Sequence, residues 1–397
     1  MTTIATFTRN VLLALAFALV AAQGAAIPEA NKRDDSPGFV ALDFDVTRNP
    51  IDLNATSNAI QKRQPLSIPL YSEGPSYGIR VSVGSDQQEV KVILDTGSSD
   101  FWVVDKSATC QRLQFCKAFG TFNPQTSSSF KSLGSSFHIK YGDGTTSDGI
   151  WAEDTVSIGG VSITNQQFAD VNSTSVNQGI LGVSRRQTES ADPEYDNVPA
   201  TLKKQGKIKT NAYSLFLNEP GALTGTIIFG GVDNAKYSGN LVEEKVDIDR
   251  YLGISLQSLN YDGNSRSTNF SAVLDSGTTI TYLPGSLVED LAKEVGAFLL
   301  PVGVDNELYF INCHKNQGTA SFTFDNGAKV DVPLSDFTLQ NTLGTCLWGL
   351  QNADSHNVPP ILGDNFLRHA YVVYNLDKET ISLAQVKYTS DSNITAI

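Results

Sequence analysis

The hydrophobic pattern of the chain opens with one uninterrupted apolar run. Residues 11–22 carry no charge, and the ten residues before them carry one, at Arg9. A membrane-spanning helix needs about 18 or more apolar residues, so this run is too short to span, and the small residues that follow it suit signal peptidase. The pattern therefore predicts a signal peptide over residues 1–24 and a secreted, extracellular product. A buried N-terminal helix is the alternative, but nothing amphipathic follows the run.

Beyond residue 63 the pattern changes to short runs rich in Val, Ile, Phe, Tyr and Thr, separated by Gly, Asn, Asp and Ser clusters. Such runs predict strands, here at 66–71, 78–83, 89–94, 226–229 and 370–375. Helical windows are few, and the best are 198–205, ended by Gly206, and 286–298, after Pro284 and Gly285. About 330 residues is large for one β core, so the sequence predicts an all-β protein of two lobes with a few short helices.

Two motifs occur twice, in the same order. VILDTGSS at 92–99 matches AVLDSGTT at 272–279, and ILG at 180–182 recurs at 361–363. The aspartate and the last glycine are 182 − 95 = 87 residues apart in the first half and 363 − 275 = 88 in the second. This repetition predicts two β lobes related by a pseudo-twofold axis, at 64–245 and 246–397, with a cleft between them.

The repeated Asp-hydroxyl-Gly unit places Asp95 and Asp275 at the tips of two buried strands. A glycine after each lets one loop pass close to the other. We expect the hydroxyls to have two roles, one pair locking the loops together and the other hydrogen-bonding the outer carboxylate oxygens. The supporting residues are Thr96, Gly97 and Ser98 in the first loop and Ser276, Gly277 and Thr278 in the second.

Two carboxylates brought side by side cannot both ionise, so one keeps a proton and the pair titrates as a unit. A water held between them could give a proton to the ionised carboxylate as it attacks a peptide carbonyl, while the protonated carboxyl donates to the carbonyl oxygen. This chemistry needs no metal, cofactor or covalent intermediate. One Asp-x-Gly is common in turns; two in a duplicated frame predict a catalytic pair at Asp95 and Asp275.

Two Lys-Arg pairs, at 32–33 and 62–63, lie between the apolar run and the first motif. Secretory processing proteases cut after such pairs, although a Lys-Arg pair can also be ordinary surface. Residues 31–63 are polar and lack the apolar density of a core. We therefore expect a propeptide over 25–63, cut after Lys62 and Arg63 to leave Gln64 as the mature N-terminus.

The six basic and six acidic residues of 1–63 cancel, so the mature chain keeps the full net charge of −13. This charge argues against nucleic acid or an anionic membrane as a partner. It also fits an acidic working pH, at which part of the carboxylate load is protonated.

Four cysteines in an exported chain predict disulfides. Of the three possible pairings we choose Cys110 with Cys116 and Cys313 with Cys346, because each bridge then stays within one half. Zinc is disfavoured, since no C-x-x-C pair occurs and the four histidines do not cluster near the cysteines. Glycosylation sequons occur at Asn172, Asn269 and Asn393.

Taken together, these motifs resemble those of the pepsin-like aspartic proteases, and the likeness covers residues 64–397. DTGSSDFWV at 95–103 and DSGTT at 275–279 look like the two active-site motifs of that family. YDNVP at 195–199, LKKQG at 202–206, FGGVDNAKYSG at 229–239 and ILGDNFLR at 361–368 look more closely like the candidapepsins, the secreted aspartic proteases of Candida yeasts.

The resemblance implies further residues and partners. YGDG at 141–144 falls where the family carries its flap, a β-hairpin that closes over substrate, with Trp102 as hydrogen-bond partner of the flap tyrosine. Ile93 and the aromatic residues near the flap would form an apolar S1 pocket. Expected partners are protein and peptide substrates, pepstatin-like inhibitors and a processing protease that cuts after Lys-Arg; the enzyme is expected to be a monomer. The flap residues are Tyr141, Gly142, Asp143 and Gly144.

Other function classes remain to be separated by test. A glycosidase also uses two carboxylates, and assays on oligosaccharides and denatured protein would distinguish it. A non-catalytic binding protein on the same fold would be favoured by loss of an aspartate or of the flap tyrosine, and none is lost. Serine and metallopeptidase interpretations fail, because the chain has neither G-x-S-x-G nor H-E-x-x-H.

Overall fold

The structure is a computed structural model of the chain. It describes residues 38–48, 75–111, 115–142, 144–301, 307–315, 317–339 and 345–397. The contacts place Ser36–Ile397 in one unit. The predicted signal peptide, the Lys62-Arg63 site, the strand expected at 66–71 and the flap residue Asp143 lie outside the described residues.

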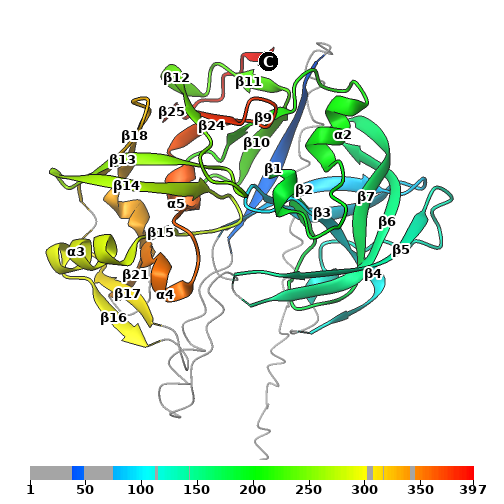
Figure 1. Cartoon of the computed structure of the whole chain (residues 1–397), viewed down its shortest axis with the longest axis horizontal. Coiled ribbons are helices and arrows are strands. Elements are labelled where there is room, and N and C mark those ends of the chain that lie inside the picture. The colour runs from blue at the N-terminus through cyan, green and yellow to red at the C-terminus, as the bar shows by residue number, and fades with distance from the viewer. Residues whose placement is uncertain are drawn as a thin grey trace, which may run out of the picture. The chain divides into compact units, whose positions relative to one another are not determined.

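The described part of the chain is built mainly of strands in four sheets (Figure 1), which confirms the predicted all-β class. The largest sheet has 13 strands in the order β12-β25-β24-β9-β10-β1-β2-β3-β8-β4-β7-β6-β5. In chain order these strands are β1 Val40–Arg48, β2 Pro75–Val83, β3 Gln88–Asp95, β4 Phe101–Cys110, β5 Lys131–Lys140, β6 Thr146–Ile158, β7 Val161–Thr174, β8 Ile180–Gly182, β9 Ala212–Phe216, β10 Thr224–Phe229, β12 Tyr237–Lys245, β24 Ala370–Asn375 and β25 Thr380–Val386.

The second half contributes a sheet of seven strands, β19-β18-β13-β14-β23-β15-β22, and a sheet of four, β16-β17-β21-β20. A pair formed by β11 Gly231–Asp233 and β26 Ile394–Ala396 completes the set. The remaining strands are β13 Gly253–Tyr261, β14 Asn264–Leu274, β15 Thr281–Leu283, β16 Phe298–Pro301, β17 Glu307–Asn312, β18 Thr319–Phe324, β19 Lys329–Pro333, β20 Thr338–Leu339, β21 Thr345–Trp348, β22 Leu350–Asn352 and β23 Ile361–Leu362.

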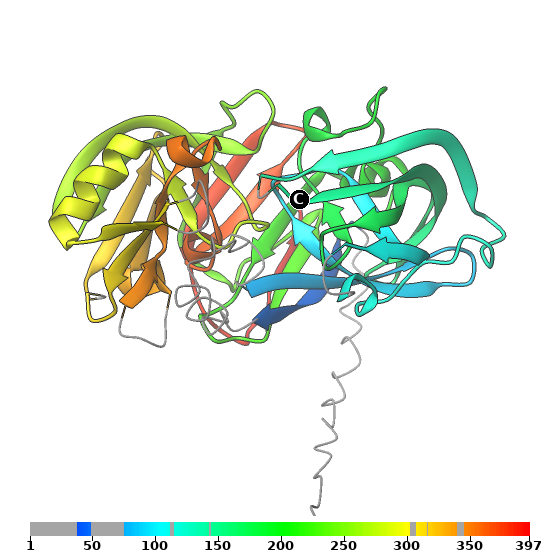
Figure 2. The ribbon, with the colours of Figure 1, turned by 90° about the horizontal axis from the view of Figure 1, so that it is seen from below.

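The two halves share the large sheet. Strand β24 of the second half pairs with β9 of the first, from Val372 with Leu215 to Asn375 with Ala212. Figure 2 shows these C-terminal strands, in orange and red, beside the green strands of the first half. One buried apolar cluster runs through both halves and includes Leu94 and Leu274, the residues before the two motif aspartates. The two motif loops therefore start from one continuous core.

The spacing of the repeated motifs has a direct structural meaning. In the first half β3 pairs in parallel with β8, so that Asp95 lies opposite Gly182. In the second half β14 pairs in parallel with β23, and Leu274 lies opposite Leu362. Each ILG segment is thus the strand that flanks one of the two Asp-hydroxyl-Gly loops, which explains why the two motifs recur at nearly the same offset.

Helices are few and short, as predicted. Helix α2, Val198–Lys204, begins at Asn197, whose side chain accepts from the Ala200 N–H, and has a proline in its first turn. Helix α3, Gly285–Val295, ends at Gly296 with φ 73°, so the predicted end at residue 298 is wrong. A left-handed glycine terminates a helix at no steric cost, and Phe298 starts β16 instead. The other helices are α4 Ala353–His356, α5 Asp364–Leu367 and the 3-10 turns η1 Phe115–Lys117, η2 Arg186–Thr188 and η3 Leu334–Phe337.

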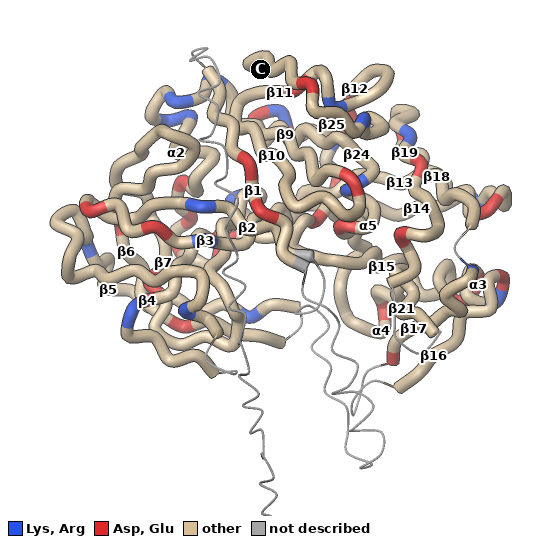
Figure 3. The backbone as a smooth tube through the Cα atoms, turned by 180° about the vertical axis from the view of Figure 1, so that it is seen from behind, with Lys and Arg blue, Asp and Glu red and all other residues tan. Residues whose placement is uncertain are grey.

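Strand β1 lies in the segment that the sequence assigns to the propeptide. It is inserted between β10 and β2, and it buries Val40, Phe44 and Val46. Its Asp45 forms ion pairs with Lys91 at 3.0 Å and Arg80 at 3.4 Å, and Figure 3 shows acidic positions along it. The expectation that this segment lacks core-forming residues is therefore wrong for residues 40–48. The strand was not predicted because its alternation of apolar and acidic residues is short. Its apolar side chains are buried by strands that lie far away in the sequence.

No helix of the described residues is long and apolar enough to cross a membrane.

Candidate active site

The two repeated loops meet and exchange hydrogen bonds through their second residues. Thr96 Oγ1 donates to the Leu274 carbonyl at 2.9 Å and accepts from the Ser276 N–H at 2.9 Å. Reciprocally, Ser276 Oγ donates to the Leu94 carbonyl at 2.9 Å and accepts from the Thr96 N–H at 3.2 Å. Both side chains are buried. The four bonds hold the tips of β3 and β14 together, so the predicted locking contacts are present.

The glycines of the loops are required by the closeness of this contact. A Cβ added to Gly97 would lie 2.6 Å from Asp275 Oδ1, and one added to Gly277 would lie 2.5 Å from Asp95 Oδ1. Contacts this short between non-bonded atoms are strongly repulsive. Each loop therefore uses its glycine to pack against the aspartate of the other loop.

The two carboxyl groups are held in matching ways. One oxygen of Asp95 accepts from the Gly97 N–H at 2.8 Å and the other from the Ser98 hydroxyl. Asp275 accepts from the Gly277 N–H at 2.8 Å and from Thr278 Oγ1 at 2.5 Å. These donors fix the orientation of both carboxyl groups.

The electrostatics of the pair follow from burial and proximity. Burial first, and then the charge of Asp95, raises the pKa of Asp275, because both disfavour a second negative charge in the same place. Such a pair retains one proton well above the ordinary range of a carboxyl group, and its pKa values belong to the pair as a whole.

The predicted flap is a hairpin of the first half. Strands β5 and β6 form it, and Tyr141 follows directly after β5. Trp102 Nε1 donates to the Tyr141 hydroxyl at 2.8 Å. The turn closes through the Gly144 N–H, which donates to the Tyr141 carbonyl at 2.9 Å. Trp102 is fully buried on β4, so it anchors the tyrosine from within the lobe.

A cleft of about 970 Å³ lies at the two loops and the hairpin, and Asp95 lines it. The second loop reaches the cleft through Gly277 and Thr278, whereas Asp275 is buried and is not among the lining residues. Thr96, Ser276 and Trp102 are buried behind its wall, and Asp143 is not described. Of the predicted site residues, the cleft is lined by Ile93, Asp95, Gly97, Ser98, Tyr141, Gly142, Gly277 and Thr278.

Other lining residues were not predicted. Several of them come from segments that carry no motif, and only their position in the fold identifies them. Phe115 is 56% exposed at the rim, and Val176, Glu189, Arg250 and Tyr251 form other parts of the wall. Burial raises the pKa of Glu189 to about 8, so this carboxyl group is neutral at acid pH.

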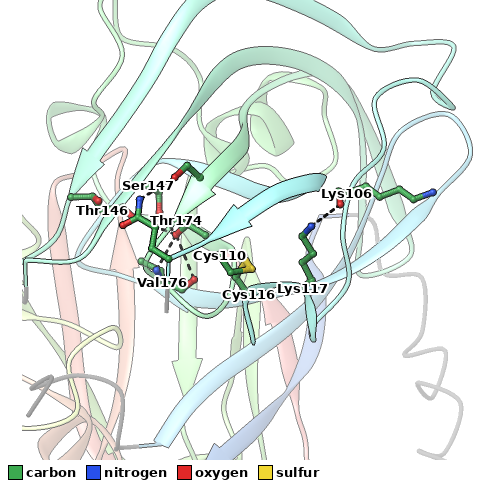
Figure 4. The surroundings of a disulfide bond; sticks show 10 residues. Lys106, Cys110, Cys116, Lys117, Thr146, Ser147, Thr174 and Val176 are labelled. Carbon is green, nitrogen blue, oxygen red and sulfur yellow. Dashed lines mark hydrogen bonds between the residues drawn. A yellow bond between two sulfur atoms is a disulfide. The ribbon is translucent and has the colours of Figure 1, made fainter. Parts of the chain in front are cut away.

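Both predicted disulfides are present. Cys110 is bonded to Cys116 (Figure 4), and Cys313 is bonded to Cys346. The first disulfide closes the segment that carries Phe115, which lines the cleft. Next to this disulfide, Lys117 Nζ donates to the Lys106 carbonyl at 2.9 Å.

In the described part of the chain, no group of three or more His, Cys, Asp or Glu side chains could hold a metal ion. The three sequon asparagines, Asn172, Asn269 and Asn393, are exposed.

Two β halves that bring a pair of Asp-hydroxyl-Gly loops together under a hairpin define an aspartic protease architecture. The profile of the family described as eukaryotic aspartyl protease matches residues 76–386. Candidapepsin-2 of Candida parapsilosis is 70% identical over 96% of this chain and 92% of its own length. Candidapepsin of Candida tropicalis is 50% identical over the whole of both chains, and secreted aspartic protease 1 of Candida albicans is 46% identical over 98% of this chain and all of its own.

The chain therefore belongs to the eukaryotic aspartyl protease family. These matches confirm the prediction of a secreted aspartic endopeptidase.

Proposed function

We propose that the enzyme hydrolyses peptide bonds of proteins at acid pH, by a water molecule activated between Asp95 and Asp275. The observation that carries this proposal is the reciprocity of the two loops. Each holds its own carboxyl group through a glycine N–H and a hydroxyl, and each is bonded to the other through Thr96 and Ser276. The first loop lines the cleft through Asp95, Gly97 and Ser98, and the second lines it through Gly277 and Thr278.

In the proposed reaction the pair starts with one proton. The ionised carboxylate accepts a proton from the water as the oxygen attacks the peptide carbonyl, and the protonated carboxyl donates to the carbonyl oxygen. The resulting tetrahedral intermediate breaks down with protonation of the leaving nitrogen. The raised pKa of Asp275 supports a pair that keeps this proton across the acid range.

We infer that the cleft binds about six to eight residues of an extended peptide through strand-like hydrogen bonds. Ile93, Tyr141, Val176 and Ile180 give the wall near Asp95 an apolar surface. Large hydrophobic residues beside the cleaved bond would bury their surface there, at about 25 cal/mol per Å² of apolar area. This favours cleavage next to such residues.

Maturation completes the proposal. Residues 1–24 act as a signal peptide, 25–63 as a propeptide, and cleavage after Arg63 leaves a monomeric enzyme with lobes at 64–245 and 246–397. Because β1 occupies a place within the large sheet, its release would expose the edges of β10 and β2. N-terminal sequencing of the secreted protein should begin at Gln64; a sequence that still contains residues 40–48 would contradict this maturation site.

A peptide library digested with the secreted protein at several pH values, with and without pepstatin, tests the activity. We expect cleavage with a maximum near pH 3 to 5, roughly the range of coupled carboxyl groups. Pepstatin should abolish it and chelators should not. Cleavage that resists pepstatin but stops with a chelator would contradict the proposal, as would binding of peptides without cleavage.

A further inference from the structure

At one end of the cleft, two segments from opposite halves are joined by a pair of arginines. Arg185 of the first half reaches into the second, where its guanidinium donates to the Ile248 carbonyl at 2.9 Å and to Glu379 at 2.6 Å. Arg250 of the second half reaches back, and its Nε donates to the Gln187 carbonyl at 3.3 Å. Each arginine thus bonds the backbone beside the other. We call this pair of contacts the arginine bridge.

The arginine bridge is connected to both catalytic loops. In the first half the Arg185 carbonyl accepts from Ser99 Oγ, within the DTGSS motif, at 2.5 Å. In the second half Ile248 and Tyr251 pack against a buried cluster that contains Val273, two residues before Asp275. The two segments that form the bridge are therefore anchored on the strands and loops that carry Asp95 and Asp275.

The same two segments both line the cleft. Thr188 and Ser190 line it from the first half, and Arg250 and Tyr251 line it from the second. The bridge spans the gap between these segments directly. The separation of the segments at this end depends on whether the guanidinium of Arg185 keeps its acceptors.

The exposure of the side chains indicates which contact of Arg185 holds the two segments together. The Arg185 side chain is only 13% exposed, whereas Glu379 is 56% exposed. An ion pair with an exposed partner is screened by solvent and contributes little. The bonds to the Ile248 and Gln187 carbonyls are different, because a carbonyl oxygen stays an acceptor at any pH. These two contacts keep their strength at the acid pH of the proposed activity.

We propose that Arg185, assisted by Arg250, sets the width of this end of the cleft and is a positioning residue for the substrate residues that bind there. The inference rests on the proposed function, since it concerns how the same cleft holds a peptide. The inference goes beyond the proposed function because it assigns the arginine bridge between the halves a role in the affinity for one side of the substrate.

The test uses three peptides and two matched variants, each expressed as the full chain and assayed as the secreted protein. The first peptide has four residues on each side of the cleaved bond. The other two are truncated to two residues on one side or on the other. Arg185→Met keeps the apolar stem and removes the guanidinium. Arg186→Met is the control, because Arg186 is 46% exposed, pairs with Asp196 inside the first half and is not itself among the residues that line the cleft.

We expect Arg185→Met to raise KM for the long peptide about 5- to 20-fold, with kcat within about twofold, since the catalytic loops keep their own bonds. It should raise KM equally for one truncated peptide and leave the other within about twofold, because only one side of the substrate reaches the bridge. Arg186→Met should behave as wild type on all three.

An unchanged KM for the long peptide, or an equal loss on both truncated peptides, would overturn the proposal. Should Arg185→Met fail to fold, Arg250→Met takes its place, since Arg250 is exposed and makes one described hydrogen bond. Arg250→Met must raise KM for the long peptide and for one truncated peptide only. An unchanged KM for the long peptide overturns the proposal. Failure of the proposed function gives a distinct result, namely wild-type protein that cleaves none of the three peptides.

Discussion

The Asp-hydroxyl-Gly loops of the two halves make nearly the same hydrogen bonds, but different residues pack behind them. Behind the first loop the Ser184 N–H donates to the Ser98 carbonyl at 2.9 Å; behind the second, the Asp364 N–H donates to the Thr278 carbonyl at 2.8 Å. The residue that donates this bond is a serine in the first half and an aspartate in the second. Burial raises the pKa of Asp364, and the nearby Arg368 opposes this shift.

The hairpin with Tyr141 belongs to the first half. The comparison separates two requirements. The chemistry of a shared proton needs two carboxyl groups held alike, and the loops provide that symmetry. An extended peptide has direction and unlike ends, so the walls around the loops need not match.

The strictest test of the symmetry is to fill the space between the loops. Gly97→Ala and Gly277→Ala each place a methyl group about 2.5 Å from the opposite aspartate. Displacing a reacting group by about 1 Å can cost 10²-fold in rate, so we expect each variant to lose at least about 10² in kcat. Overpacking should also lower stability by about 1–3 kcal/mol.

Steady-state kinetics and thermal unfolding measure both effects for the glycine variants. Similar losses of kcat and stability in the two variants support the view that both loops are packed equally closely against the opposite aspartate. Full kcat in either one would show that the loops are not in close contact.

The locking bonds provide a second, smaller test. Thr96→Val and Ser276→Ala each remove a hydroxyl that makes two bonds across the loops. Each should lower the free energy of unfolding by about 1–3 kcal/mol, since buried partners lose their bonds, and reduce kcat about tenfold. The double variant should lose less than the sum, because the residues share one network. Strict additivity in denaturant unfolding would refute the reciprocal lock.

The flap tests the asymmetric part of the comparison. Trp102→Phe removes the donor to the Tyr141 hydroxyl, so the flap loses its anchor. We expect kcat/KM to fall about 3- to 10-fold, in line with one lost hydrogen bond. Trp151→Phe is the matched control, because Trp151 is buried in the same apolar cluster but packs against Phe137 and Tyr195. Equal effects of both variants on kcat/KM would indicate lost packing only.

The smallest effect concerns pH and stability in the first half. Burial, and then the charge of Asp105, raises the pKa of Asp170 to about 8. An aspartate in the unfolded chain has its ordinary pKa near 3.8, so between these values the folded state binds more protons. Stability should then be greatest below about pH 4 and fall as pH rises toward 8. Glu189 acts in the same direction.

We expect Tm to drop by several degrees between pH 4.5 and 7.5. Asp170→Asn should reduce that drop, because its amide does not titrate. A Tm that rises over this interval in the wild type, or a drop that Asp170→Asn leaves unchanged, would contradict this assignment.

The sequence predicts well that the two repeated loops meet, because the duplicated motif occurs twice in the same order. The offsets of 87 and 88 residues correspond to strands β8 and β23 beside the two loops. The arginine bridge could not be predicted in this way. Arg185 and Ile248 lie 63 residues apart, and a backbone carbonyl as acceptor leaves no sequence signal. Strand β1 was missed for the same reason, since β10 buries it from far along the chain. The end of α3 was missed because the apolar residues beyond Gly296 continue into β16.

The most direct test of the shared proton is the activity of Asp95→Asn and Asp275→Asn, each measured on a peptide substrate across pH 3 to 7 beside the wild type. An amide can neither accept the proton of the water nor hold the proton of the pair. The account predicts that each variant folds with a Tm close to that of the wild type and loses about 10³-fold or more in kcat at every pH. Substantial turnover by either variant would contradict it.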